Sequence, residues 1–123
     1  LCRGLLSGKM RRDTQFNGDD LRNNDPKFQE PRYAQYLAAV DALERFARER
    51  HGKHVLELAV RWLLDGHANG IALWGGRRPD QMEPLDAIDG WKLNADDLAE
   101  IDRLLAKHVS DPVGPEFMAP PTR

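Results

Sequence analysis

The chain has 123 residues, enough for one domain with a single hydrophobic core. Its 41% apolar and 31% charged residues are typical of a globular protein, and its net charge of -2 excludes the strongly basic surface of most proteins that bind nucleic acid or anionic membranes. No apolar run is long enough to cross a membrane and no signal-peptide pattern opens the chain. The one cysteine, Cys2, fits a reducing compartment. We therefore expect a cytoplasmic protein without nucleic-acid or membrane partners, and the first residue, Leu1, indicates a processed or partial product.

Residues 1–30 are predicted to form a long irregular connection. Turn-forming residues dominate this segment, including Gly4, Gly8 and the Asn-Asn-Asp-Pro sequence at 23–26. A loop of this length in a compact domain is usually functional or disordered. The segment is therefore either a functional loop or a disordered one.

Two helices are predicted over residues 31–65. Pro31 is suited to the first turn of the first helix, and Gly52 to its C-terminal end. The second helix is predicted from about Val55 to Leu64. Apolar residues at spacings of three and four predict one buried face on each helix. These residues are Tyr33, Tyr36, Leu37, Val40, Leu43, Phe46 and Ala47 in the first helix, and Val55, Leu58, Ala59, Trp62 and Leu63 in the second.

The next predicted element is a short strand at residues 71–74, with the sequence Ile-Ala-Leu-Trp. A fully apolar run bounded by glycines is typical of a strand that is buried on both faces of a parallel sheet. One strand cannot form a sheet, and the sequence contains no other convincing strand. Its neighbours must come from another chain or from residues outside this sequence, unless the strand prediction itself is wrong.

Residues 75–108 are predicted to hold a glycine turn followed by two helices. Pro79 is suited to start the first of them, which Pro84 must shorten, kink or restart. Asn94 is expected to cap the final helix, which carries an apolar face and a basic last turn. Four prolines predict an irregular tail over residues 109–123.

The segment 75–81 is the sharpest candidate for a binding site. Glycines let the backbone approach a phosphate, a helix N-terminus presents free N–H groups, and arginines form charge-assisted hydrogen bonds to phosphate oxygens. An anion site is therefore predicted at the sequence Gly-Gly-Arg-Arg of residues 75–78, followed by the helix start at Pro79. The alternative is a tight strand-to-helix turn with two solvated arginines. The pattern is neither a Walker loop nor a GxGxxG fingerprint.

Two weaker candidates occur elsewhere. Residues 4–9, which end in Lys9, have the glycine spacing of a pyrophosphate-binding turn, although the local pattern alone favours a generic glycine turn. His51 and His54 lie on either side of a helix break, but no Cys or carboxylate cluster completes a metal site, so we predict no bound metal. Cys2 has no recognisable histidine partner nearby and is not predicted to be a nucleophile.

Four motifs, taken together, resemble those of the aldo-keto reductases. Residues 1–9 (LCRGLLSGK) resemble the family's PLxxGLLTGK segment, and residues 58–64 (LAVRWLL) resemble its LAxxWLL helix. Residues 74–82 (WGGRRPDQM) resemble its PGARRPEQL turn, and residues 93–102 (LNADDLAEID) resemble its LSxEDLxxID final helix. Each motif alone is unspecific, but the four follow the family's order and cover nearly the whole chain.

The resemblance implies a (β/α)8 barrel that uses NADP(H) to reduce an aldehyde or ketone to an alcohol, or runs the reverse reaction. The chain would be the C-terminal third of this barrel, from the end of strand seven through helix eight and the tail. Residues 1–30 would be a cofactor loop and residues 71–74 the last barrel strand. The remainder of the barrel, or a second chain, would supply the neighbouring strands.

Nine positions are predicted to hold NADP(H), and eight of them match residues that do so in the family. Those that match contacts beside the pyrophosphate are Leu1, Cys2, Arg3, Lys9 and Arg22. Those that match contacts beside the 2′-phosphate and the adenosine are Gly75, Arg77 and Gln81. Arg78 is expected to be an additional phosphate ligand. The family's catalytic tyrosine, lysine, aspartate and histidine match nothing in this sequence, so we expect no catalytic residue here.

The sequence departs from the family pattern at Pro84 and Leu85, where Glu-Asn usually holds the adenine. Proline cannot supply that side chain, so adenine is held by other groups or not at all. An alternative function is therefore a non-catalytic nucleotide-sensing or interaction module on the same fold. A further alternative is an autonomous helical domain that self-associates through its apolar faces.

Overall fold

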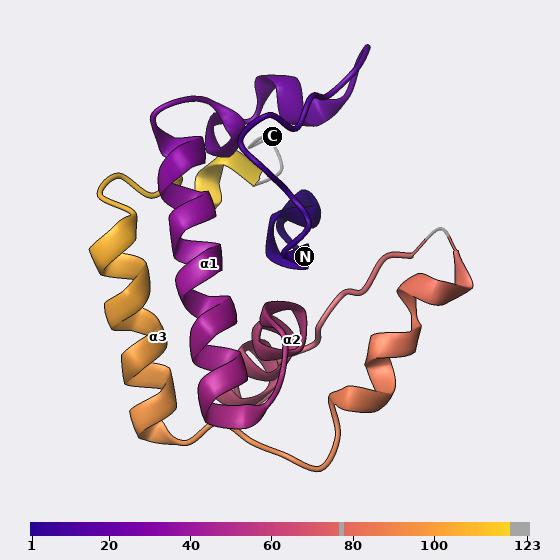
Figure 1. Ribbon diagram of the computed structural model, residues 1–123, viewed down its shortest axis with the longest axis vertical. Coiled ribbons are helices and arrows are strands. Elements are labelled where there is room, and N and C mark those ends of the chain that lie inside the picture. Colours follow the sequence, from indigo (N-terminus) through magenta and orange to yellow (C-terminus); the bar gives the residue numbers. More distant parts are fainter. Residues whose placement is uncertain (77, 119–123) are drawn as a thin grey trace.

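The computed structural model describes residues 1–76 and 78–118, and these residues form three α-helices and several short 3-10 helices. The α-helices are α1 (Arg32–His51), α2 (Val55–Gly66) and α3 (Ala95–His108). The 3-10 helices are η1 (Cys2–Ser7), η2 (Leu21–Asn24), η3 (Pro26–Phe28), η4 (Pro79–Gln81), η5 (Glu83–Ala87) and η6 (Pro115–Met118). Figure 1 shows α1 and α3 side by side, with α2 near the C-terminal end of α1.

The ends of α1 are those that the sequence predicts. The helix begins directly after Pro31 and ends at Gly52, which adopts the left-handed conformation with φ +64°. The Gly52 N–H donates to the carbonyl of Arg48 at 3.0 Å and so closes the last turn. The predicted apolar face is also confirmed, because its residues are either buried or packed against the core: Tyr33, Tyr36, Leu37, Val40, Leu43, Phe46 and Ala47.

The helix α2 packs its predicted face into the same core, with Val55 and Leu58 almost fully buried. Arg61 is also buried, although it lies outside the predicted apolar face. Its Nε donates to Asp65 Oδ2 at 3.0 Å, and the same oxygen accepts the Leu93 N–H at 2.9 Å. Asp65 thus joins the end of α2 to the segment that leads into α3.

The start of α3 confirms the predicted cap. Asn94 Oδ1 accepts the Asp97 N–H at 2.9 Å, and Asp97 Oδ2 accepts the Asn94 N–H at 3.1 Å. This reciprocal pair is a capping box, which satisfies two N–H groups that the helix itself cannot bond. Asp97 is buried and its Oδ1 also accepts Arg50 Nε at 2.9 Å. The cap therefore ties the first turn of α3 to the last turn of α1.

The predicted strand at residues 71–74 is wrong for this chain taken by itself. No strand occurs in residues 1–76 and 78–118, and residues 71–74 follow an irregular path away from α2 (Figure 1). Ile71 is 82% exposed and Leu73 is 81% exposed, rather than buried on both faces. The physical reason is that a strand needs backbone partners, and the described residues offer none beside this segment.

An apolar groove of about 260 Å³ lies between η1 and the three α-helices. Leu5, Val40, Leu58 and Trp62 are among the residues that line it, and Lys27 is its only charged lining residue within the described part of the chain. The groove and the exposed Ile71 and Leu73 leave much apolar surface uncovered. No helix in the described ranges is long and apolar enough to cross a membrane.

Candidate functional site

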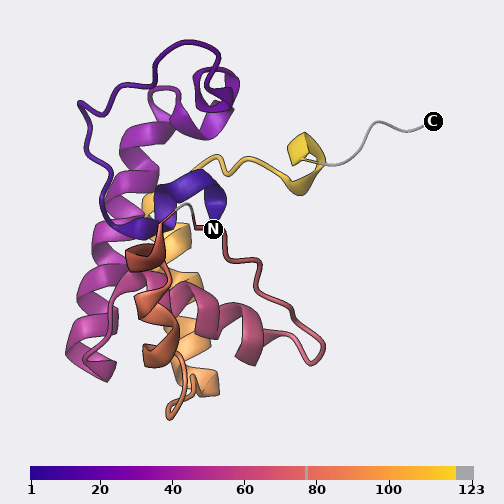
Figure 2. The same ribbon diagram turned by 90° about the vertical axis from the view of Figure 1, so that its right-hand side faces the viewer.

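A cleft of about 420 Å³ is lined by both glycine-containing segments that the sequence singles out. Both segments lie on the same side of α1, the side that faces the viewer in Figure 2. The N-terminal wall consists of Leu1, Gly4, Ser7, Lys9, Met10, Thr14 and Arg22. The opposite wall consists of Leu56, Trp74, Gly75, Asp80, Gln81 and Pro84. The fold thus brings together residues that lie far apart in the sequence.

Left-handed backbone shapes the N-terminal wall. Cys2, Arg3 and Gly4 have φ values of +44°, +54° and +90°, so the chain turns sharply at the start of η1. A Cβ atom on Gly4 would also lie 3.1 Å from the Cε atom of Met10. The positive φ therefore favours glycine at position 4, and any larger residue there would also require Met10 to shift.

Arg3 is not among the residues that line the cleft, and its side chain joins this turn to residues 21–27. Its Nη1 donates to the carbonyl of Leu21 at 3.2 Å and lies 3.5 Å from Oδ2 of the buried Asp25. Lys27 Nζ lies 3.0 Å from the other oxygen of Asp25. Arg3 is thus held by protein groups and does not line the cleft.

Arg22 lines the cleft and is held from two sides. Its Nε and Nη2 donate to the two carboxylate oxygens of Asp20 at 2.9 and 2.5 Å. Its guanidinium carbon lies 4.3 Å from the centre of the Phe16 ring, in cation–π contact. The hydrogen bonds from the Arg22 side chain and backbone lower the pKa of Asp20 to about 2.

The opposite wall is a turn that is closed by its own side chains. Trp74 Nε1 donates to the carbonyl of Gln81 at 3.0 Å, and the Arg78 N–H donates to Gln81 Oε1 at 3.3 Å. Arg78 donates from Nε and Nη2 to the two oxygens of Asp80, both at 3.0 Å. These hydrogen bonds, with a contribution from the charge of Lys9, lower the pKa of Asp80. As predicted, Pro79 starts a helix that is short and restarts at Glu83.

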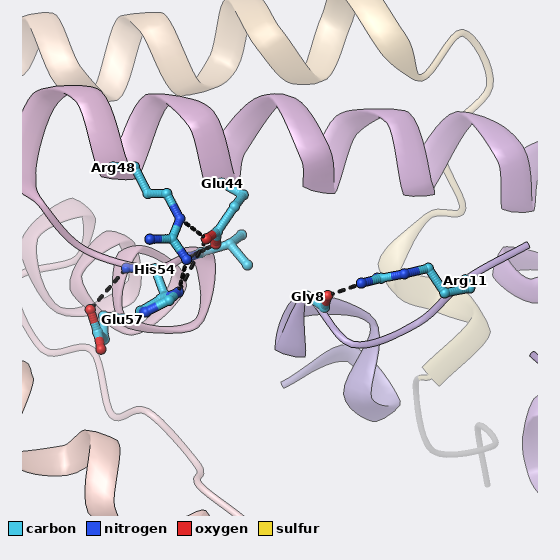
Figure 3. A network of polar contacts seen from close by, with 7 residues as sticks. Gly8, Arg11, Glu44, Arg48, His54 and Glu57 are labelled. Atoms are coloured by element: carbon cyan, nitrogen blue, oxygen red, sulfur yellow. Dashed lines mark hydrogen bonds and ion pairs between the residues drawn. The ribbon is translucent and has the colours of Figure 1, made fainter.

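The His54 side chain belongs to a polar network between α1 and α2 (Figure 3). Its Nδ1 lies 3.1 Å from Glu44 Oε1 and 2.9 Å from Arg48 Nη2, and Glu44 Oε2 accepts the Val55 N–H at 2.7 Å. Partial burial opposes ionisation of Glu44, but its hydrogen bonds with the Val55 N–H, Arg48 and His54 outweigh this effect and lower its pKa. His51 Nε2 instead lies 3.3 Å from Asp97 Oδ2. No cluster of metal-binding side chains occurs among the residues that the structure describes.

The nine predicted cofactor positions fall into three groups. Five line the cleft: Leu1, Lys9, Arg22, Gly75 and Gln81. Three lie elsewhere: Cys2 borders the apolar groove, Arg3 bonds to Leu21, and Arg78 is paired with Asp80 on the surface. Arg77 lies outside the described residues. Sequence reasoning missed Asp20 and Asp80 as the partners of Arg22 and Arg78, and only the spacing of two residues in each pair gave a signal.

The chain is similar to known proteins of one family. Residues 1–106 match the model of the aldo/keto reductase family. The chain is 58% identical over 123 residues to the aldo-keto reductase YhdN of Bacillus subtilis, and 25% identical over 104 residues to the aldo-keto reductase str7 of Strobilurus tenacellus. It also superposes on the structure of the glycerol dehydrogenase AKR11B4 from Gluconobacter oxydans with a TM-score of 0.84 and 52% sequence identity over 96% of the chain.

The chain belongs to the aldo/keto reductase family. It covers 37% and 31% of the two curated relatives and 36% of the glycerol dehydrogenase, so it spans about a third of their length. The family and the structural match imply a (β/α)8 barrel as the fold to which these helices belong. The uncovered groove and the exposed residues 71–74 are consistent with a part of such a barrel.

Proposed function

We propose that the protein is an NADP(H)-dependent oxidoreductase that reduces an aldehyde or ketone to an alcohol, or runs the reverse reaction, in the cytoplasm. The chain would be the C-terminal third of its barrel and would bind the cofactor phosphates. The observation that carries the proposal is the cleft that brings Lys9 and Arg22 opposite Gly75 and Gln81. The relatives are named as aldo-keto reductases and, in one case, a glycerol dehydrogenase, which supports a small alcohol or carbonyl substrate.

The chemistry of the cleft fits the phosphate end of a dinucleotide. Lys9 is exposed, and within the described residues its ammonium group forms no ion pair. A Cβ on Gly75 would meet no atom within 4 Å, so the backbone of this residue is open to a ligand. Lys9 would neutralise a phosphate oxygen, Arg22 would donate to a second one, and Gln81 would offer an amide to the adenosine.

The end of the cleft where the adenine would lie differs in chemistry from the phosphate end. Pro84 lines the cleft and Leu85 is exposed, and neither offers a side-chain hydrogen bond. These residues would contact the adenine ring by apolar packing alone. When bound, the nicotinamide supplies or accepts the hydride, and we place the catalytic side chains in the part of the protein outside this chain. Arg77 and Arg78 remain proposed ligands of the 2′-phosphate.

A second candidate function is a non-catalytic nucleotide-sensing module. The observation that favours it is Pro84 on the wall of the cleft, because a proline there removes a polar contact to adenine while the phosphate side is kept. Such a protein would bind NADP(H) without turning over a carbonyl substrate.

Titration of the full-length protein with NADPH tests the proposal, with tryptophan fluorescence as the signal because Trp74 lines the cleft. We expect saturable quenching, and we expect Lys9→Ala to weaken binding about tenfold or more because a charge-assisted contact is lost. Lys107→Ala, at the exposed end of α3, is the matched control and is expected to bind as the wild type does. Absence of NADPH binding would refute the proposal, while binding without turnover of any aldehyde or alcohol would select the sensing module.

A further inference from the structure

Asp20 and Arg22 form a closed unit at the edge of the cleft. Asp20 accepts Arg22 Nε and Nη2 in a forked pair at 2.9 and 2.5 Å, and its Oδ1 also accepts the Arg22 N–H at 3.0 Å. Two side-chain hydrogen bonds and one backbone hydrogen bond therefore fix both ends of the Arg22 side chain. Such a fork holds a guanidinium in one plane, which a single ion pair does not.

Aromatic packing completes this restraint. The Arg22 guanidinium carbon lies 4.3 Å from the centre of the Phe16 ring. Phe16 packs edge-on against Phe28, with 5.3 Å between ring centres, and Phe28 is buried in the core. The platform beneath Arg22 is thus anchored to the protein interior, although Arg22 itself lies in the short 3-10 helix η2.

The fork leaves one nitrogen of Arg22 unused. Nη1 takes no part in the contacts with Asp20, and it lies 4.0 Å from the place that a Cβ of Gly4 would occupy. Gly4 and Arg22 both line the cleft. Nη1 is therefore the guanidinium nitrogen that lies next to the left-handed turn of η1.

We propose that Asp20 is a positioning residue for cofactor binding, which fixes Arg22 so that Nη1 can donate to a phosphate of the dinucleotide. The inference rests on the proposed function, because it takes NADP(H) as the ligand. Asp20 acts through Arg22 and does not itself contact the cofactor. Asp20 orders the flexible Arg22 side chain before the cofactor binds. Less side-chain entropy is therefore lost when the phosphate binds.

Simple electrostatics makes the opposite prediction, which gives the proposal a sharp test. Asp20 carries a negative charge close to the cleft, so Asp20→Asn would tighten the binding of an anionic cofactor if only charge mattered. If positioning dominates, Asp20→Asn weakens binding because the forked pair is broken and Arg22 becomes mobile. The sign of the change in the NADPH dissociation constant separates the two.

The test is a double-mutant cycle on the full-length protein with NADPH as the probe. We expect Asp20→Asn to raise the dissociation constant about three- to tenfold, as ordering of one arginine side chain implies. In an Arg22→Ala background, Asp20→Asn is expected to have no further effect. The Michaelis constant for NADPH should rise in parallel while kcat at saturating NADPH stays unchanged. Glu100→Gln removes a carboxylate from the exposed Glu100–Arg103 pair on α3 and is the matched control, with binding unchanged.

Asp20→Glu provides a second variant that keeps the charge, and it should bind NADPH with an affinity between those of the wild type and Asp20→Asn. Unchanged or tighter binding by Asp20→Asn, or an effect that persists without Arg22, would overturn the inference. If the wild type binds NADPH and Arg22→Ala weakens binding while Asp20→Asn does not, the inference fails and the proposed function stands. If the wild type does not bind NADPH, both fail.

Discussion

The indole of Trp74 donates from Nε1 to the carbonyl oxygen of Gln81 at 3.0 Å, which closes the turn on one wall of the cleft. The bond spans the segment that holds Gly75 and Gly76, of which Gly75 lines the cleft. Because the glycines impose little conformation themselves, the shape of this turn depends on the side chain that crosses it.

Trp74→Phe is expected to weaken NADPH binding about three- to tenfold, because the loss of one hydrogen bond loosens the turn. The emission of NADPH itself is the appropriate signal, since this variant removes the tryptophan of the cleft. Trp91→Phe is the matched control: Trp91 Nε1 donates to the Ala87 carbonyl at 2.8 Å, but Trp91 does not line the cleft. Equal effects of the two substitutions would contradict the role assigned to Trp74.

The lowered pKa of Asp20 predicts how the stability of the folded protein depends on pH. Its pKa is lowered from 3.8 to about 2 in the folded protein, so the unfolded chain binds more protons between these values. The contribution of Asp20 is therefore fully present above about pH 4 and is lost as the pH falls through about 2. Thermal unfolding of the wild type and Asp20→Asn should differ by a constant amount from pH 5 to 9, and the difference should shrink below pH 4. A difference that changes near neutral pH would contradict this assignment.

Asn94→Ala is expected to destabilise the protein by about 1 kcal/mol, because the cap of α3 is lost. The effect should exceed that of Asp96→Ala, which changes an exposed residue in the same helical turn without breaking the capping box. Urea unfolding followed by circular dichroism measures both. If the two variants are equally stable, the capping box contributes nothing beyond the charge at the helix start.

Residues 71–74 are expected to become a strand in the full-length protein. Their backbone amides should then exchange slowly with deuterated solvent, because neighbouring strands bond to them. In the isolated chain of residues 1–123 the same amides should exchange rapidly, as the exposed Ile71 and Leu73 indicate. Rapid exchange in the full-length protein would show that this segment is not a barrel strand.

Local sequence signals predict most of the helical structure. Pro31, Gly52 and Asn94 mark helix ends correctly because a cap or a stop depends on a few adjacent residues. The prediction of a strand at 71–74 is wrong for this chain by itself because a strand depends on distant backbone partners, and these are not among the described residues.

The site is only partly predictable for a similar reason. Lys9 and Gln81 belong to recognisable motifs, and both line the cleft. They do not indicate that Arg78 is paired with Asp80, or that Asp20 holds Arg22, because the partner of a charged side chain depends on how a loop folds. The two arginines look alike in sequence, but only Arg22 lines the cleft.

A crystal structure of the full-length protein with NADP+ tests the central claim most directly. We expect the diphosphate beside Lys9 and Arg22, with Asp20 still paired to Arg22, and the adenosine phosphate beside residues 75–81. A cofactor bound away from this cleft, or crystals that take up no NADP+ at saturating concentration, would contradict it.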